Sequence, residues 1–240
     1  MLKIERTNVY GWEAAIRGMR NPMNSWDKSD SDYAWDESKE DVSYFVGEND
    51  LKLMKNLSKA GNDHSKYLRM LNVTVDITAP LYWWKEFDTY KVGTVANSCS
   101  TMHKIHAKEF TLDDFSCEHL LDSDKEPIAA EDWVDVSEED EDGMTEQWDA
   151  IEFVKMTVEA LNVYRERYLE TNDKVYWWQM IQLLPTSYNQ KRTVQLNYAV
   201  LKNMYFSRRN HKLNEWVDLC DWMLTLPYFK EVCVDVVNNP

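Results

Sequence analysis

The sequence predicts an α+β fold, because stretches with the two-residue period of a strand alternate along the chain with stretches of helical period. Residues 70–79 (MLNVTVDITA) alternate apolar and polar side chains, as a half-buried strand does. Residues 48–60 carry Leu, Met and Leu at three-residue spacing and stop before Gly61, which is typical of a helix. Only six Gly and six Pro interrupt the chain, so we expect one domain over 1–240 without long flexible linkers.

The other expected elements follow from the same periods and from proline and glycine stop signals. They are a strand within 1–10 and helices over 11–20, over 80–90, from Thr145, over 192–208 and over 213–225. The polar stretch 24–41 is interpreted as a surface excursion. Residues 131–149 carry ten acidic side chains, whose mutual repulsion predicts a solvated connector.

Composition excludes several classes of function. The chain has 27 Lys and Arg against 42 Asp and Glu, a formal charge of −15, which disfavours sequence-independent nucleic-acid binding. No apolar stretch approaches the roughly 20 residues that cross a bilayer, and the first residues contain no signal-peptide core, so no membrane partner is expected. The four cysteines lack CxxC spacing, which favours reduced thiols and a cytoplasmic location.

Several common catalytic motifs are absent from the sequence. It contains no GxGxxG, GxxxxGK[ST], GxSxG or HExxH, so the usual signatures of dinucleotide and P-loop enzymes, of serine hydrolases and of zincins are missing. The tryptophan pairs at 83–84 and 177–178 offer flat surfaces for a ligand, but core packing is the favoured interpretation.

One group of residues is a candidate metal site. His103 and His106 are three residues apart, so a helix would place both imidazoles on one face, and Cys117 and His119 follow. The spacing matches none of the common zinc patterns, and imidazoles near an acidic segment often only hydrogen-bond to carboxylates. No metal is therefore predicted.

Two blocks of the sequence resemble the flavin-dependent thymidylate synthases. That family has a His-x-Ser/Thr stretch, a strand ending in Ala-Pro, then Q-x-x-R-H-R and N-E-x-S-x-R-Y. In the first block, 64–103, Ala79-Pro80 ends the expected strand, residues 86–91 (EFDTYK) stand at the double-arginine motif, and after one extra residue 97–103 (NSCSTMH) keep the Asn and Ser. The second block, 181–216, is similar to the family's R-x-x-L-P segment, its Asn-containing helix and its closing motif.

The resemblance implies an α+β subunit with a mixed or antiparallel sheet flanked by helices, assembled as a homotetramer. It also implies reductive methylation of deoxyuridine monophosphate (dUMP) to dTMP with FAD, so the expected small-molecule partner is a pyrimidine nucleotide. Reduced nicotinamide and methylenetetrahydrofolate would be the co-substrates. Residues 20–46 and 107–143 have no counterpart and are interpreted as insertions.

Seven residues stand at functional positions of the family, some of them as replacements for the family's own residue. The implied FAD contacts are His64, Tyr90, Lys91 and Asn197. Ser100 stands near the nucleotide phosphate and Arg208 addresses the pyrimidine or its sugar-phosphate; these two are the implied catalytic residues, and with Glu86 they form the substrate-binding set. From the residues alone, the favoured interpretation of Ser100 is a turn or helix hydroxyl satisfied by the backbone, and that of His64 is a cap for the chain after Gly61.

The departures from the family pattern concern positive charge. Thr89, Met102 and Ile181 replace arginines, and Lys91 replaces a fourth. Each lost charge-assisted contact costs about 1.5–3 kcal/mol of nucleotide binding. The nearby cations available to compensate are Lys85, Lys104, Lys191, Arg192 and Arg209. The sequence therefore leaves three functions open: an enzyme of this family, a catalytically impaired nucleotide-binding or sequestering oligomer, and an interaction protein that uses 131–149.

Overall fold

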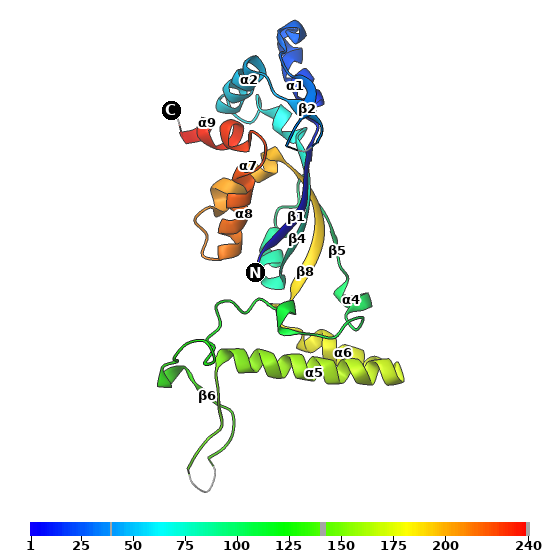
Figure 1. Cartoon of the computed structure of the whole chain (residues 1–240), viewed down its shortest axis with the longest axis vertical. Coiled ribbons are helices and arrows are strands. Elements are labelled where there is room, and N and C mark those ends of the chain that lie inside the picture. Colours follow the sequence, from blue (N-terminus) through cyan, green and yellow to red (C-terminus); the bar gives the residue numbers. More distant parts are fainter. Residues whose placement is uncertain (39, 140–142, 239–240) are drawn as a thin grey trace. The chain divides into compact units, whose positions relative to one another are not determined.

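The computed structural model describes residues 1–38, 40–139 and 143–238 (Figure 1). Their contacts group the chain into two compact units, and each is described by itself. Unit 1 comprises Met1, Thr78–Glu86 and Ser98–Lys191, and unit 2 comprises Leu2–Ile77, Phe87–Asn97 and Arg192–Pro240. The expectation of one domain over 1–240, with insertions at 20–46 and 107–143, stays a prediction.

The main sheet has four strands. Their order is β1 (Lys3–Tyr10), β4 (Asn72–Pro80), β8 (Asn189–Asn197) and β5 (Val95–Ser98). Two antiparallel pairs stand outside it, β2 (Asp32–Asp36) with β3 (Asp41–Phe45) and β6 (Val134–Asp135) with β7 (Gln147–Trp148). Strand β4 has most of the predicted alternation, because Val73, Val75 and Ile77 are buried while Thr74 is half-buried. Asp76, on the predicted polar side, is nevertheless buried, and its Oδ1 accepts a hydrogen bond from the Thr193 hydroxyl at 2.7 Å.

Unit 2 contains most of the predicted helices. They are α1 (Trp12–Arg20), α2 (Glu48–Lys59), α7 (Tyr198–Arg208) and α8 (Asn214–Leu224), followed by a π-helical turn (Lys230–Val234) and α9 (Asp235–Asn238). Helix α1 ends where Pro22 enters a 3₁₀ turn, as the stop signal predicts. The buried side chains of this unit include Met54, Tyr67, Trp216 and Phe229.

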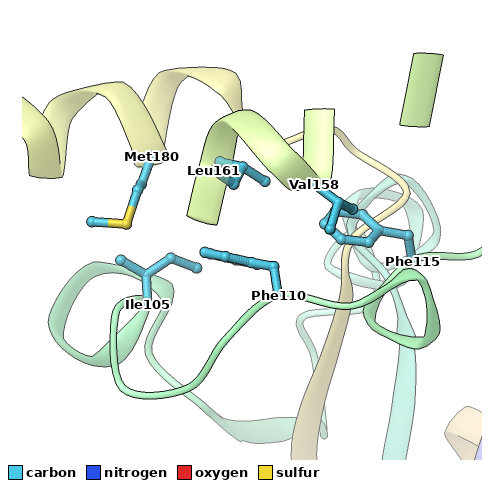
Figure 2. Packing of buried hydrophobic residues seen from close by; sticks show 6 residues of the cluster. All are labelled: Ile105, Phe110, Phe115, Val158, Leu161 and Met180. Atoms are coloured by element: carbon cyan, nitrogen blue, oxygen red, sulfur yellow. The ribbon is translucent and has the colours of Figure 1, made fainter. Parts of the chain in front are cut away.

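Unit 1 contains the long helix of the chain and a separate apolar core. Its helices are α3 (Leu81–Phe87, whose last residue belongs to unit 2), α4 (Thr101–Lys104), α5 (Ala150–Thr171) and α6 (Lys174–Leu183). Figure 2 shows six core side chains converging from α5, from α6 and from the segment after α4: Ile105, Phe110, Phe115, Val158, Leu161 and Met180. Helix α6 is absent from the sequence predictions, and the tryptophan pair 177–178 lies on it.

Two predicted helix starts are wrong, and a capping side chain explains each. Residues 192–197 are not helical: they belong to β8, and α7 begins only after Asn197, whose Oδ1 accepts a hydrogen bond from the Val200 amide at 3.1 Å. Likewise α5 begins at Ala150 rather than Thr145, because Asp149 Oδ1 accepts from the Glu152 amide at 3.0 Å.

The acidic segment and the surface excursion are more ordered than predicted. Asp149 is fully buried as the α5 cap, while most other described residues of 131–149 are exposed; positions 140–142 lie outside the described residues. The excursion 24–41 contains strand β2 and the start of β3. Helix α3 also ends at Phe87, before the predicted limit of 90. The predicted α+β class is nevertheless confirmed.

Candidate functional site

Arg208, at the end of α7, packs against two aromatic rings of unit 2. Its Nε donates a hydrogen bond to the Tyr90 hydroxyl oxygen at 3.0 Å. Its guanidinium carbon lies 4.6 Å from the centroid of the Trp216 ring and 5.7 Å from that of Tyr90. A guanidinium over an aromatic ring is attracted by the negative ring face. We call Arg208, Tyr90 and Trp216 the Arg208 cluster.

Trp216 is the fixed member of this cluster. It is fully buried near the start of α8, and its ring stacks on Phe87 with 6.3 Å between centroids and 16° between planes. His211, between α7 and α8, packs its ring edge against the same indole at 6.2 Å. A buried indole held from two sides has little freedom, so it defines the position of the arginine. The sequence predictions miss Trp216, although it closes the block 181–216 that carries the family resemblance.

Asn197 lies at the other end of α7 and meets the segment that carries Tyr90. Its Oδ1 caps α7, and its side-chain nitrogen lies 3.0 Å from the place that a Cβ would occupy at Gly93. Gly93 has a φ of +76°, a left-handed conformation that favours glycine. The Thr94 hydroxyl oxygen next to it is buried and has no hydrogen-bond partner among the described residues. Segment 90–94 therefore joins two of the implied FAD positions, Tyr90 and Asn197, and contributes a buried polar atom that a ligand can satisfy.

The remaining implied FAD residues lie outside these contacts. Lys91 is exposed directly after Tyr90. His64 is exposed in the turn after α2, where its amide donates to the Gly61 carbonyl at 3.1 Å. This bond is a backbone turn that does not involve the imidazole, so the capping role suggested by the residues alone and the flavin role of His64 both stay predictions.

Ser100 and Glu86 belong to unit 1. Ser100 is exposed and caps α4, because its Oγ accepts a hydrogen bond from the His103 amide at 3.1 Å. Its hydroxyl proton can still be donated, since a serine hydroxyl is both donor and acceptor. Glu86 is half-buried on α3.

The positions that lost an arginine in unit 1 carry apolar side chains that fit their surroundings. Ile181, on α6, packs against the core cluster of Figure 2. Met102 is 47% exposed, and its carbonyl accepts a hydrogen bond from Trp177 Nε1 at 3.0 Å. Neither position supplies a charge to a phosphate.

Two of the possible compensating cations already have neighbours in unit 2. Arg192 Nη1 lies 2.7 Å from Asp88 Oδ1, and the arginine side chain is only 14% exposed. The guanidinium carbon of Arg209 lies 5.2 Å from the Phe206 ring centroid and 5.9 Å from that of Tyr205. Lys85 and Lys104 are exposed, and Lys191 is half-buried. Arg192 in particular would have to break an ion pair to reach a ligand.

The histidines of unit 1 show no metal-site geometry. The His106 ring packs edge-on against Tyr168 at 4.9 Å between centroids. Within the described residues, no group of three or more His, Cys, Asp or Glu side chains is arranged to hold a metal ion. In the same part of the chain, none of the helices combines the length and the apolar character needed to cross a bilayer.

Comparison with known proteins gives structural neighbours only. No protein-family model matches the chain, and neither does any curated protein sequence. Thymidylate synthase X (ThyX) from Helicobacter pylori, solved with FAD and dUMP, is 19% identical over 100% of both chains with a TM-score of 0.62. A second structure of this flavin-dependent enzyme with FAD and dUMP is 18% identical over 98% of this chain and 99% of that one, with a TM-score of 0.61.

A third neighbour is the UMP/dUMP methylase PolB from Streptomyces cacaoi, bound with 5-Br dUMP. It is 15% identical over 94% of this chain and 89% of that one, with a TM-score of 0.52. Identities this low establish the fold, and the coverage shows that the likeness extends over nearly the whole chain. The fold expected from blocks 64–103 and 181–216 is therefore confirmed: this chain has the fold of the flavin-dependent thymidylate synthases.

Proposed function

We propose that the protein is a flavin-dependent enzyme that modifies a pyrimidine nucleotide, and specifically that it methylates dUMP reductively to dTMP. Two kinds of support converge on this function. PolB is named as a UMP/dUMP methylase, and the ThyX structures are of a thymidylate synthase with FAD and dUMP. The Arg208 cluster supplies, in this chain itself, a positioned cation beside aromatic rings.

Arg208 carries the proposal. Its Nε–H donates a hydrogen bond to Tyr90, and its guanidinium lies over the Trp216 ring. These two contacts within the chain set the orientation of the guanidinium plane. A preorganised guanidinium loses little freedom on binding and matches the geometry of a phosphate or a uracil carbonyl. Arg208 therefore binds and orients the nucleotide.

The cofactor residues are proposed around segment 90–94. FAD supplies the hydride chemistry when it is bound. Tyr90 places a ring at the flavin edge, Lys91 supplies a positive charge, and Asn197 offers its side-chain NH₂ group, because its carbonyl oxygen is committed to capping α7. The buried Thr94 hydroxyl is added here as a further polar contact, and His64 keeps its proposed place in the flavin site.

The substrate side of the proposal uses residues of unit 1. Ser100 donates its hydroxyl proton to a phosphate oxygen, since its oxygen already accepts from His103. Glu86 contacts the nucleotide. Reduced nicotinamide and methylenetetrahydrofolate are the proposed co-substrates, a homotetramer is the proposed assembly, and the cytoplasm is the proposed location.

A second function is favoured by the surroundings of the lost arginines. Ile181 packs in an apolar cluster, Met102 carries no charge, and Arg192 is paired with Asp88. With about 1.5–3 kcal/mol lost at each missing contact, a nucleotide would bind too weakly for efficient turnover. The alternative is thus a nucleotide-binding or sequestering protein of the same fold without catalysis.

Binding and turnover, measured separately, test the two functions. We expect the purified protein to bind FAD and to gain thermal stability with dUMP, because a ligand that binds the native state stabilises it. Arg208→Ala is expected to weaken dUMP binding about 10- to 150-fold, the equivalent of about 1.5–3 kcal/mol. The control is Arg209→Ala, which removes an exposed neighbouring arginine and should have little effect on dUMP binding. Turnover is followed with the full set of co-substrates, by release of tritium from dUMP labelled at the methylated carbon.

Each outcome selects one function. Binding with tritium release supports the enzyme, and binding of dUMP without release under any co-substrate combination supports the sequestering protein. Failure to bind both FAD and dUMP, or equal dUMP affinities for Arg208→Ala and Arg209→Ala, contradicts the proposed site.

A further inference from the structure

Unit 2 contains a cavity that shares no residue with the Arg208 cluster. Its volume is about 920 Å³, and it is lined by the end of β1, by the β2–β3 hairpin and by the segment that follows α8. Small-molecule sites commonly have volumes of roughly 300–1,000 Å³. Neither the family resemblance nor the structural neighbours assign a role to this cavity.

Aromatic rings from separate elements form much of its wall. Tyr33 and Tyr44 are direct partners across the hairpin and pack edge to face, with 4.9 Å between ring centroids. Trp12 and Tyr228 form a second edge-to-face pair at 5.5 Å. Trp222 also lines the cavity, and its Nε1 donates to Thr7 Oγ1 at 3.1 Å. Ring faces carry partial negative charge, which attracts cations and not anions.

The charged residues of the wall are all acidic. Asp36, Asp41 and Glu231 line the cavity, and within the described part of the chain no Lys, Arg or His does. Asp36 and Asp41 are also direct partners in the hairpin register. Like charges opposite each other on neighbouring strands repel, and a cation bound beside them would reduce that repulsion.

A buried ion pair anchors the chain that leads into the hairpin. Arg20 Nε lies 2.6 Å from Asp50 Oδ1, and both side chains are buried. The hydroxyls of Ser29 and Ser31 each donate to Asp50 Oδ2 at 2.7 Å. Ser31 Oγ in turn accepts from the Gly47 amide at 2.9 Å. Residues just before β2 and just after β3 are thus held by one network, which fixes the base of the hairpin.

The opposite wall is held by Tyr228. Its hydroxyl accepts a hydrogen bond from the Val46 amide at 3.3 Å, which connects the segment after α8 with the end of the hairpin. Tyr228 has a φ of +56°, a conformation that costs free energy for a bulky residue and persists only where the surroundings enforce it. The aromatic walls are therefore held by contacts within the chain itself, and a site whose walls are held in this way loses less freedom on binding.

We propose that this cavity binds a small organic cation with a weakly hydrated charge, of the quaternary onium type. Aromatic faces stabilise such a cation, and the three carboxylates complement its charge. The same carboxylates repel phosphate, so the cavity is distinct in chemistry from a nucleotide site. The proposal does not depend on the proposed function.

A pair of probes with opposite charge tests it. Tetraphenylphosphonium and tetraphenylborate have nearly the same size and shape, so the difference between their affinities reports charge preference. We expect titration calorimetry on the full chain to show one phosphonium bound per chain and the borate bound at least about tenfold more weakly. Binding of the borate as tightly as the phosphonium overturns the proposal.

Matched variants distinguish binding of the phosphonium in the cavity from its general attraction to a negatively charged chain. The double substitution Asp36→Asn with Asp41→Asn is expected to weaken phosphonium binding at least about fivefold. The double substitution Asp32→Asn with Glu37→Gln removes the same charge from the same hairpin outside the cavity wall, and it should change binding less than about twofold. Tyr33→Ala should likewise weaken binding and Trp35→Ala, which is 62% exposed and not part of the wall, should not. Equal effects of cavity and control variants overturn the proposal.

Two measurements on otherwise unmodified protein keep the test decisive if a variant fails to fold. Fluorine-labelled tryptophan should show the Trp222 resonance, identified with Trp222→Phe, shifting as the phosphonium is added. An unshifted Trp222 resonance overturns the proposal, and so does displacement of the phosphonium by dUMP. Unchanged phosphonium affinity in Arg208→Ala supports a separate site.

Discussion

The Arg208 cluster of unit 2 and the Met102 and Ile181 positions of unit 1 show opposite outcomes at positions where the family resemblance implies an arginine. In unit 2 the arginine is present and is held by Tyr90 and Trp216. In unit 1 the replaced positions have joined other structures: Ile181 packs against an apolar core, and Met102 is an exposed residue of α4. Arg208 is thus held as part of an aromatic cluster, while the side chains at 102 and 181 fit their surroundings without a cation. The resemblance places two further replaced arginines, at Thr89 and Lys91, in unit 2, so the contrast is one between single positions and not between whole units.

The largest effect is expected at the platform of the Arg208 cluster. Trp216→Ala removes a fully buried indole that stacks on Phe87 and supports Arg208, and it should lower the free energy of unfolding by about 3–5 kcal/mol. The control is Trp178→Ala in unit 1, which is 42% exposed and should cost less than about 1 kcal/mol. Urea unfolding measures both. Similar losses in the two variants would show that Trp216 is not a structural support.

An arginine restored at position 181, beside the core of unit 1, should lower the free energy of unfolding. Ile181→Arg replaces a side chain that packs against the apolar cluster, and we expect unfolding free energy to fall by about 1.5–3 kcal/mol. Leu183→Arg, on the same helix and 44% exposed, should change it by less than about 0.5 kcal/mol. If Ile181→Arg is tolerated as well as the control, the loss of this arginine was not fixed by packing.

An arginine restored at the exposed position 102 should leave the stability unchanged and should show whether this position contacts the nucleotide. Met102→Arg is expected to leave the unfolding free energy within about 0.5 kcal/mol, because the side chain is 47% exposed. If unit 1 meets the phosphate as proposed, dUMP affinity rises about tenfold, whereas Met102→Gln leaves it unchanged. Equal dUMP affinities for the two variants would remove position 102 from the nucleotide site.

The smallest effect is expected at the hydroxyl of Tyr90. Tyr90→Phe keeps the ring but removes the acceptor of the Arg208 Nε–H, so dUMP binding should weaken by about 0.5–1.5 kcal/mol, or roughly two- to twelvefold. Tyr205→Phe, a half-buried tyrosine on the same helix as Arg208, is the matched control. Calorimetric titration with dUMP distinguishes the pair, and a silent Tyr90→Phe would mean that the hydrogen bond does not orient the arginine for binding.

Much of the fold could be predicted wherever a single period dominates the sequence. The alternation in 70–79 and the stop signals around 11–20 and 48–60 are local, and the structure follows them closely. The stretch 192–208 is different because Val194, Leu196 and Tyr198 also suit a strand, and the boundary is decided by one capping side chain, Asn197. A short cap of this kind is easily overlooked beside an extended apolar pattern.

The family resemblance proposes the residues of the site one by one, and their roles stay predictions, but it does not give their arrangement. Tyr90, Asn197 and Arg208 follow from the family resemblance, yet their contacts depend on three segments that only the tertiary fold brings together. The sequence does not reveal the role of Trp216, because a tryptophan in a helix is usually interpreted as a core residue. Here the side chain is both part of the core and a support for the charged Arg208. The cavity beside the hairpin escaped prediction for a similar reason, since residues 24–41 show no period that signals a strand.

The close approach of Gly93 to Asn197 has a consequence for how this sequence can change. The family resemblance implies one additional residue between Lys91 and Asn97, and the left-handed backbone at Gly93 lies within that stretch. The Cβ of any larger residue at position 93 would lie only 3.0 Å from the side-chain amide nitrogen of Asn197, the residue that caps α7. Transplanting the family's double-arginine motif into 89–91 is therefore more promising if the downstream glycine is left untouched, and a shortened loop would first need a new way to turn.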